Sequence, residues 1–207
     1  MSARSVGDPA GAVLVGRRIR LRPLVAGDFE EWREVRLHNE SWLTPWEPRP
    51  VPGRPDVVRD ARAFASRCGA RAREAQFGTA YGFGIFVDDR FSGEINLSSV
   101  QRGPLQTADI GYWIDRRRAG HSYMSEAVVL LARFAFEDLA LHRLQISIIP
   151  RNLRSRRVVE KLNLREEGLA VRLVEINGVW EDHLRYAITA EEWLDRRDQL
   201  VGEWLNG

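Results

Sequence analysis

The sequence predicts a single domain of mixed α/β class, and three observations support this prediction. A chain of 207 residues can bury one sizeable core but is rather short for two full domains. Its hydrophobic content of 44% and charged content of 29% are those of ordinary globular proteins. Segments with the two-residue period of strands alternate with segments of helical period, without a clear linker. We therefore expect one domain over residues 1–207, with its core at about 17–189 and a last helix at about 190–204.

The first third of the chain predicts one strand and two helices. Residues 17–24, "RRIRLRPL", alternate polar and apolar side chains as in a half-buried strand. Asp28 is suited to cap a helix over residues 29–43. The prolines of residues 44–56 remove backbone donors and predict a loop, after which a second helix is expected over about residues 57–75.

The middle of the chain predicts a hairpin followed by a strand, a helix and a strand. In residues 79–100, the sequence "DDR" separates two strand-like runs. Residues 108–114 predict a further strand, residues 125–139 a helix with one apolar face, and residues 143–150 another strand. Because a long helix joins these two strands, the second can lie parallel to the first.

The last part of the chain predicts a short helix, a hairpin and a final helix. The short helix is expected at residues 153–162. The dipeptide Asn177-Gly178 is the strongest short hairpin signal and predicts an antiparallel strand on each side. Thr189 and Glu192 match a capping box for a last helix that ends near Trp204.

Composition and charge exclude several classes of function. No apolar run approaches the ~20 residues of a membrane span, and the N-terminal stretch lacks the apolar segment of a signal peptide. We therefore expect a cytoplasmic protein without a membrane partner. The single Cys68 excludes an internal disulfide and fits a reducing compartment. A net charge of +2 with well-mixed acidic residues argues against a nucleic-acid partner, and no residues with metal-ligand spacing occur, so we expect no metal.

The basic residues are unusual, because Lys161 is the only lysine and every other strong cation is arginine. Arginine binds phosphate with forked geometry, so the bias is compatible with an anionic ligand. Nucleotide composition of the source genome is the alternative explanation. Three of the arginines, Arg116, Arg117 and Arg118, are consecutive.

Residues 111–127, "GYWIDRRRAGHSYMSEA", place these arginines where a strand gives way to a helix. The first N–H groups of a helix have no intrahelical acceptor, and the helix dipole is positive there. With Gly120 allowing close approach, such a turn can bind the oxygens of a diphosphate. The alternative is a solvated turn with an unoccupied helix start. The stretch is neither a GxxxxGK[ST] loop nor a GxGxxG loop.

Three segments, residues 111–127, 141–168 and 174–189, together resemble the GNAT superfamily of N-acetyltransferases. The resemblance is closest to the ribosomal-protein N-terminal acetyltransferase (RimJ/RimL) branch and runs from about residue 17 to residue 189. It implies a central, mostly antiparallel twisted sheet flanked by helices, with a parallel strand pair splayed at the acetyl-CoA site. It also implies an acetyl-CoA-dependent N-acetyltransferase in which an amine attacks the thioester directly.

The resemblance also implies which residues bind acetyl-CoA. Backbone N–H groups around Trp113 and Ile114 would stabilise the oxyanion. Asn152 would face the cofactor arm, and Ser155 would stand near the leaving thiolate. The loop that holds the CoA diphosphate in the family matches Arg117, Arg118, Ala119, Gly120, His121 and Ser122.

Two positions depart from the usual family pattern. Ser122 stands where Gly or Ala is usual, which adds a hydroxyl, and a serine there is also a good helix N-cap. Asn163-Leu164 replaces the usual Gly-Phe, which alters a turn and a packing contact. Neither change removes a reacting group.

Two carboxylates are candidates for the base that deprotonates the amine. Glu175 matches a glutamate of the family, and Glu94 is the reserve candidate. Each has an alternative as a solvated strand carboxylate, and Asn152 has an alternative as a helix cap. His142 and His183 are expected to be hydrogen-bonded structural residues.

Trp42 and Trp46 lie in "SWLTPWEP", beside prolines, and could form a rigid apolar wall for a peptide N-terminus. Core packing under a loop is the alternative. The expected acceptor is a protein α-amino group, such as that of a ribosomal protein. A small amine such as a polyamine or an aminoglycoside remains open, as do a non-catalytic acyl-CoA sensor and pairing as a homodimer.

Overall fold

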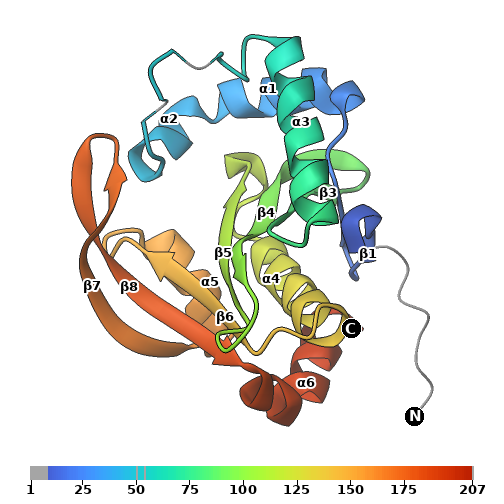
Figure 1. Cartoon of the computed structure of the whole chain (residues 1–207), viewed down its shortest axis with the longest axis vertical. Coiled ribbons are helices and arrows are strands. Elements are labelled where there is room, and N and C mark those ends of the chain that lie inside the picture. The colour runs from blue at the N-terminus through green and yellow to red at the C-terminus, as the bar shows by residue number, and fades with distance from the viewer. Residues whose placement is uncertain (1–8, 50, 54, 207) are drawn as a thin grey trace.

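A computed structural model describes residues 9–49, 51–53 and 55–206, and it contains an eight-stranded sheet with helices on both faces (Figure 1). Its strand order is β1-β2-β3-β4-β5-β6-β8-β7, and every neighbouring pair is antiparallel except β5–β6. The predicted mixed α/β class is therefore confirmed. Residues 1–8 lie outside the described residues. They begin the N-terminal stretch in which we expected no signal peptide.

The strands and helices have the following bounds. The strands are β1 Leu14–Val15, β2 Ile19–Arg22, β3 Tyr81–Val87, β4 Arg90–Gln101, β5 Thr107–Ile114, β6 Arg143–Ile148, β7 Arg165–Ile176 and β8 Val179–Thr189. The α-helices are α1 Phe29–His38, α2 Glu40–Leu43, α3 Ala61–Gln76, α4 Tyr123–Arg133, α5 Leu153–Lys161 and α6 Ala190–Trp204. Short 3₁₀ turns occur at η1 Pro9–Gly11, η2 Ala26–Asp28, η3 Thr44–Trp46 and η4 Arg116–Arg118, and a π-helical turn, η5, at Phe134–Asp138.

The parallel pair β5–β6 is short, and its two strands then part. Residues 107–109 of β5 face residues 143–145 of β6, and no later residues of the two strands pair with each other. Beyond this point β5 continues beside β4 and β6 beside β8. We call the diverging segments, residues 110–114 of β5 and 146–148 of β6, the wedge. The carboxyl ends of these strands lead to α4 and α5, so both helices begin at the open end of the wedge.

Two hydrophobic clusters hold helices on opposite faces of the sheet. The larger one packs α4 and α6 against the sheet, and α4 is buried from Met124 through Ala132. The smaller one joins α1 and α3 to β3 and β4 through Trp32, Phe64 and Phe91. Figure 1 shows α1 and α3 on one side of β3–β5 and α4 with α6 on the other. Each fully buried large side chain contributes about 1.5–3 kcal/mol through removal of its apolar surface from water.

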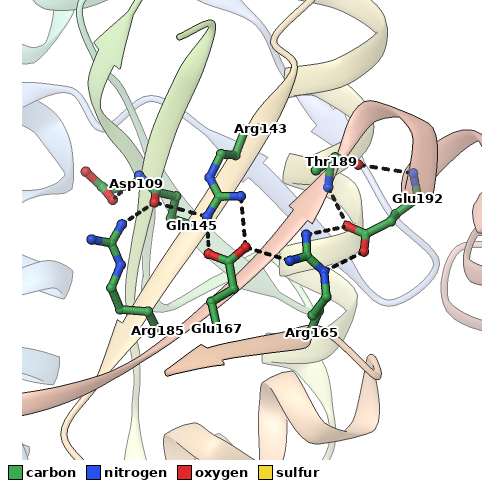
Figure 2. A network of polar contacts seen from close by, with 8 residues as sticks. All are labelled: Asp109, Arg143, Gln145, Arg165, Glu167, Arg185, Thr189 and Glu192. Atoms are coloured by element: carbon green, nitrogen blue, oxygen red, sulfur yellow. Dashed lines mark hydrogen bonds and ion pairs between the residues drawn. The ribbon is translucent and has the colours of Figure 1, made fainter. Parts of the chain in front are cut away.

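A polar network holds the closed end of the wedge together (Figure 2). At the last paired position of β5 and β6, the Gln145 amide donates to the Asp109 carboxylate at 3.4 Å. Gln145 in turn accepts from Arg185 of β8. Arg143 pairs with Glu167 of β7, and Glu167 also accepts from Arg165 at 2.7 Å. The network therefore links strands β5, β6, β8 and β7 on the face that helices α4 and α6 leave open.

Most predicted elements are confirmed. The antiparallel hairpins form around Asp88-Asp89 and around Asn177-Gly178, and all four of these residues adopt positive φ. The strand after the long helix lies parallel to the one before it. The Thr189–Glu192 capping box at the start of α6 is also present, with both of its hydrogen bonds. These features depend on residues close together in sequence, which explains why the sequence predicts them.

Several local predictions were wrong. The helix expected over residues 29–43 breaks at Asn39, whose side chain is turned into the protein interior. Asp28 precedes α1 without capping it, because its carboxylate pairs with Arg22 and accepts from the Val25 N–H. The second helix starts at Ala61 rather than near residue 57, because Asp60 caps it by accepting from two backbone N–H groups.

The region around α4 differs from the prediction at both ends. Ser122 occupies the N-cap position but has a left-handed backbone, φ 64°, and makes no side-chain capping bond. The helix expected over residues 125–139 begins already at Tyr123 and changes to a π-helical turn at Phe134. In the part of the chain that the structure describes, no helix is long and apolar enough to cross a membrane.

The polar network should make stability depend on pH. Hydrogen bonding from Arg143 lowers the pKa of the Glu167 carboxyl below its ordinary value, and hydrogen bonding from Arg165 does the same for Glu192. A carboxyl with a lowered pKa stabilises the fold above its unfolded pKa, and this contribution is lost as the pH falls through the folded pKa. Glu167→Gln should therefore lower the free energy of unfolding by about 1 kcal/mol at pH 7 and by much less at pH 3.

Urea unfolding of the wild-type protein and of the Glu167→Gln variant, at pH 7 and at pH 3, measures this loss of stability. Glu203→Gln is the matched control, because Glu203 is exposed and forms no ion pair with another described residue. An equal loss for Glu167→Gln at pH 7 and pH 3 would contradict the assignment of the network.

Candidate functional site

The arginine-rich turn at the open end of the wedge presents bare backbone N–H groups. Residues 117–122, which we call the cradle loop, leave η4 and enter α4. Gly120 has φ 86°, and a side chain there would meet no atom within 4 Å, so the loop is open on that side. Within the described part of the chain, the N–H groups of Gly120, His121 and Ser122 donate to no protein acceptor. Such convergent amides at a helix start suit an anion.

A buried amide and a buried carboxylate hold the start of this turn. The side chain of Asn39, fully buried where α1 gives way to α2, accepts from the Arg116 N–H at 2.8 Å and donates to Asp115 at 3.0 Å. Asp115 also accepts from the Arg117 N–H and its guanidinium. Burial alone would raise the pKa of Asp115, but hydrogen bonds from Arg117 and Asn39 outweigh it and hold the pKa below its ordinary value. Asp115 therefore stays charged and keeps the turn in place.

A buried ion pair holds the other end of the turn. Glu126 of α4 is fully buried and accepts from the Arg18 N–H at 2.7 Å and from its guanidinium at 2.9 Å. Arg18 also donates to the carbonyl oxygen of His121 at 3.0 Å. The carbonyl of His121 is thereby turned toward Arg18. The cradle loop is thus fixed by Arg18, just before β2, as well as by Asn39, between α1 and α2.

The predicted cofactor side chains lie around the cradle loop. Arg117 pairs with Asp115, and Arg118 lies 3.6 Å from the exposed carboxylate of Asp88. The imidazole of His121 is exposed, with its ring centroid 5.7 Å from that of Tyr123. The hydroxyl of Ser122 accepts a hydrogen bond from the ammonium of Lys161 at 2.7 Å.

Asn152 and Ser155 begin α5 on the opposite side of the wedge. Asn152 caps α5, because its oxygen accepts from the Ser155 N–H at 3.2 Å. Its side-chain amide group donates to no other described residue and is free for a ligand. The Ser155 hydroxyl donates to the Tyr112 hydroxyl at 3.0 Å, which in turn lies 3.2 Å from the Ser155 carbonyl. The two hydroxyls therefore bridge β5 and α5 across the wedge.

Tyr112 is a site residue that the sequence analysis missed. Loss of hydration raises the pKa of its hydroxyl well above the ordinary value, so it remains a neutral phenol that can donate a hydrogen bond. No motif marks this residue, because its partner Ser155 lies 43 positions later in the chain.

The two predicted tryptophans lie near the wedge in a cationic setting. Trp42 lies 5.5 Å from the guanidinium of Arg116 and 4.2 Å from that of Arg154, measured to the ring centroid. The guanidinium of Arg151 lies 4.9 Å from the ring of Trp46. Both tryptophans are half-buried and belong to neither hydrophobic cluster. The tip of the β7–β8 hairpin touches the same segment, because the Asn177 N–H donates to the Glu47 carbonyl at 3.1 Å.

The two candidate bases have different surroundings. Glu175 is exposed on β7 opposite Trp180, and its carboxylate has no ion-pair or hydrogen-bond partner among the described residues. Glu94, next to Trp113 in the sheet, accepts from the Trp32 indole at 2.7 Å and pairs with Arg67. Both oxygens of Glu94 are therefore engaged in holding α1 and α3, whereas the carboxylate of Glu175 contacts solvent.

His142 and His183 have protein partners, and no metal cluster forms among the described residues. His142 lies 3.1 Å from Glu191, and buried His183 lies 2.9 Å from the Glu181 carbonyl. No group of three or more His, Cys, Asp or Glu side chains within that part of the chain converges as metal ligands would. The site that the described residues form is thus built from N–H donors, arginines and hydroxyls.

The N–H groups, arginines and hydroxyls of this site fit the phosphate end of a coenzyme A. Comparison with known proteins identifies the family. A family model described as the acetyltransferase (GNAT) domain matches residues 18–165. The chain belongs to the GNAT family of acetyltransferases. The predicted resemblance is therefore confirmed, and acetyl-CoA is the co-substrate that membership of this family indicates.

Individual relatives agree with this family. The chain is 38% identical over 178 residues to the probable N-acetyltransferase YjcK of Bacillus subtilis (strain 168), covering 85% of this chain and 96% of that protein. It is 29% identical over 187 residues to the ribosomal protein uS5-alanine N-acetyltransferase of Escherichia coli (strain K12), covering 86% and 92%. A solved structure of Mycobacterium smegmatis RimJ in complex with CoA-disulfide superposes with a TM-score of 0.85 at 32% identity, covering 93% and 94%.

The anchoring of the cradle loop by Asn39 generates a prediction. Asn39→Ala removes one acceptor and two donor contacts and leaves buried Asp115 short of a partner. Leaving a buried polar group unsatisfied costs about 1–3 kcal/mol, so we expect the free energy of unfolding to fall by about 2–3 kcal/mol. Denaturant unfolding measures this loss, and calorimetry should show weaker CoA binding by the folded variant. The exposed Asn206→Ala serves as the control, and equal stability of the two variants would contradict the anchoring role.

Proposed function

We propose that this GNAT enzyme transfers acetyl to the N-terminal α-amino group of a protein, such as a ribosomal protein. The observation that carries the proposal is the cradle loop, which presents bare amides at the open end of the wedge. The similarity to the uS5-alanine N-acetyltransferase of Escherichia coli supports a protein α-amine as acceptor.

Bound acetyl-CoA supplies the acetyl group as a thioester. In our proposal, the free N–H groups of Gly120, His121 and Ser122 bind the diphosphate, and the Arg117 and Arg118 side chains add positive charge. The free amide group of Asn152 donates to the cofactor arm. An N–H group on the edge of β5 that β6 leaves unpaired, around Trp113 and Ile114, would stabilise negative charge on the carbonyl oxygen.

Ser155 and Tyr112 hold the proton that the leaving sulfur needs. We assign the proton transfer to the Ser155 hydroxyl, and Tyr112, kept neutral by its raised pKa, can donate a hydrogen bond to Ser155 when Ser155 turns its own proton toward the sulfur. Cys68 does not offer an acyl-enzyme route, because it lies buried in the smaller cluster and burial raises the pKa of its thiol. The burial of Cys68 and the raised pKa of its thiol both support direct attack by the amine.

The amine side is formed by Glu175, Trp42 and Trp46. An N-terminal α-amine has a pKa of about 7.7–8.0, so only a modest acid must lose its proton. The unpartnered carboxylate of Glu175 can accept that proton directly or through water, and Glu94 can do so only if Arg67 releases it. Trp42 and Trp46 offer apolar faces to the first side chains of the acceptor.

The roles of Ser155 and Glu175 generate a prediction. The pair Ser155→Ala and Glu175→Gln should lower kcat at least about a hundredfold, because each single acid–base group typically contributes that much or more. The affinity for CoA should stay within about twofold, since neither side chain belongs to the cradle loop. Steady-state kinetics and calorimetry separate the two quantities. The control pair is Ser66→Ala and Glu203→Gln, both exposed and distant in sequence, and an unaltered kcat in the test pair would overturn these roles.

The acceptor class has its own experiment. Peptides varied at their first residues are incubated with the protein and acetyl-CoA, and mass spectrometry locates the added acetyl group. We expect modification of the N-terminal nitrogen and none of lysine side chains. Transfer only to polyamines or aminoglycosides would favour a small-molecule acceptor. CoA binding without transfer to any amine would favour a non-catalytic acyl-CoA sensor.

A further inference from the structure

The only lysine of the chain lies against the cradle loop. Lys161, the last residue of α5, donates from its ammonium to the Ser122 hydroxyl at 2.7 Å. The side chain is exposed, and no carboxylate of the described residues lies within ion-pair distance of it. An ammonium has three donors, so two remain for another acceptor.

The charges around Lys161 are not balanced by the protein. Arg18 pairs with Glu126, and Arg117 pairs with Asp115. Arg118 lies 3.6 Å from the Asp88 carboxylate, and the guanidinium of Arg116 lies over the ring of Trp42. Lys161 instead stands at the start of α4, where the helix dipole is positive and repels a cation by about 0.3–1 kcal/mol. An anion at the cradle loop would remove this repulsion and use the free donors of the ammonium.

The path of α5 places Lys161 and Ser155 at two ends of one site. The helix spans nine residues, which is about 13 Å at 1.5 Å per residue. Its first turn reaches Tyr112 in the wedge, and its last residue reaches Ser122 in the cradle loop. The helix therefore flanks the whole route from the anion-binding turn to the reacting end.

We propose that Lys161, oriented by Ser122, binds a phosphate group of CoA and sets the preference of this enzyme for phosphorylated over unphosphorylated pantetheine compounds. The inference rests on the proposed role of the cradle loop. Ser122, where glycine or alanine is usual in the family, supplies the hydroxyl that holds the ammonium in place. The diphosphate and the 3′-phosphate of CoA offer the same chemistry, and the choice of ligand distinguishes them.

Because Lys161 is the only side-chain amine in the sequence, chemical labelling reports on it directly. The wild-type protein is treated with an N-hydroxysuccinimide acetate ester, and peptide mass spectrometry follows modification of Lys161 over time. CoA at ten times its Kd should slow this modification about tenfold. Pantetheine, which lacks every phosphate, should protect far less at the same concentration.

Calorimetry of variants supplies the second measurement. Lys161→Met should weaken CoA binding about tenfold, which is the loss expected for one charge-assisted contact, and Lys161→Arg should retain most of the affinity. Arg62→Met is the matched control, because Arg62 is exposed on α3 and its side chain forms no hydrogen bond or ion pair with another described residue. Thermal unfolding of each variant checks that the fold is intact.

Comparing CoA with 3′-dephospho-CoA identifies the phosphate that Lys161 binds, and two outcomes would contradict the inference. If the tenfold loss in Lys161→Met persists with 3′-dephospho-CoA, Lys161 binds the diphosphate, and if it disappears, Lys161 binds the 3′-phosphate. Unchanged CoA affinity in Lys161→Met together with unprotected labelling overturns this inference and leaves the proposed function standing. Absence of CoA binding by the wild-type protein overturns the cradle assignment and this inference together.

Discussion

The structure depends on the point at which β5 and β6 stop pairing. The two strands are held together only at residues 107–109 and 143–145, and each then follows a different neighbour. Backbone groups on the inner edge of β5 are thereby left for a ligand, and the helices that follow both strands begin at the same place. A fully paired sheet would close this space, so the chemistry of the family requires the interruption.

Polar side chains hold the interruption in a defined shape. The network of Figure 2 clamps the closed end, while Asn39, Asp115 and Glu126 anchor the cradle loop at the open end. Charged and amide groups at zero or near-zero exposure are costly unless fully hydrogen-bonded, and here each has several partners. The loop therefore keeps its shape while the N–H groups of Gly120, His121 and Ser122 stay unpaired.

The two candidate carboxylates, Glu94 and Glu175, also differ in their surroundings. Glu94, although it is beside Trp113, is committed to Trp32 and Arg67 and thus to holding α1 and α3. Glu175 comes from the far end of the chain, where the β7–β8 hairpin meets the segment of Trp42 and Trp46. Helix α5 joins the two ends of the site, with the Ser155 hydroxyl in its first turn and the Lys161 ammonium at its last residue.

The sequence by itself determined the order and type of nearly all elements, both hairpin turns, the capping box at Thr189 and the position of the cradle loop. These depend on periodicity, turn residues and motifs within a few positions of one another. Only the tertiary structure decided that the first helix breaks at Asn39, that Ser122 adopts a left-handed conformation, and that Tyr112 joins Ser155. Asn39 and its partner Arg116 are 77 residues apart in the sequence. Ser122 and Lys161 are 39 residues apart, and Tyr112 and Ser155 are 43 apart. Such distant groups meet only after the sheet has formed. No local pattern can encode contacts of this kind, because their energy comes from burial and hydrogen bonding in the assembled fold.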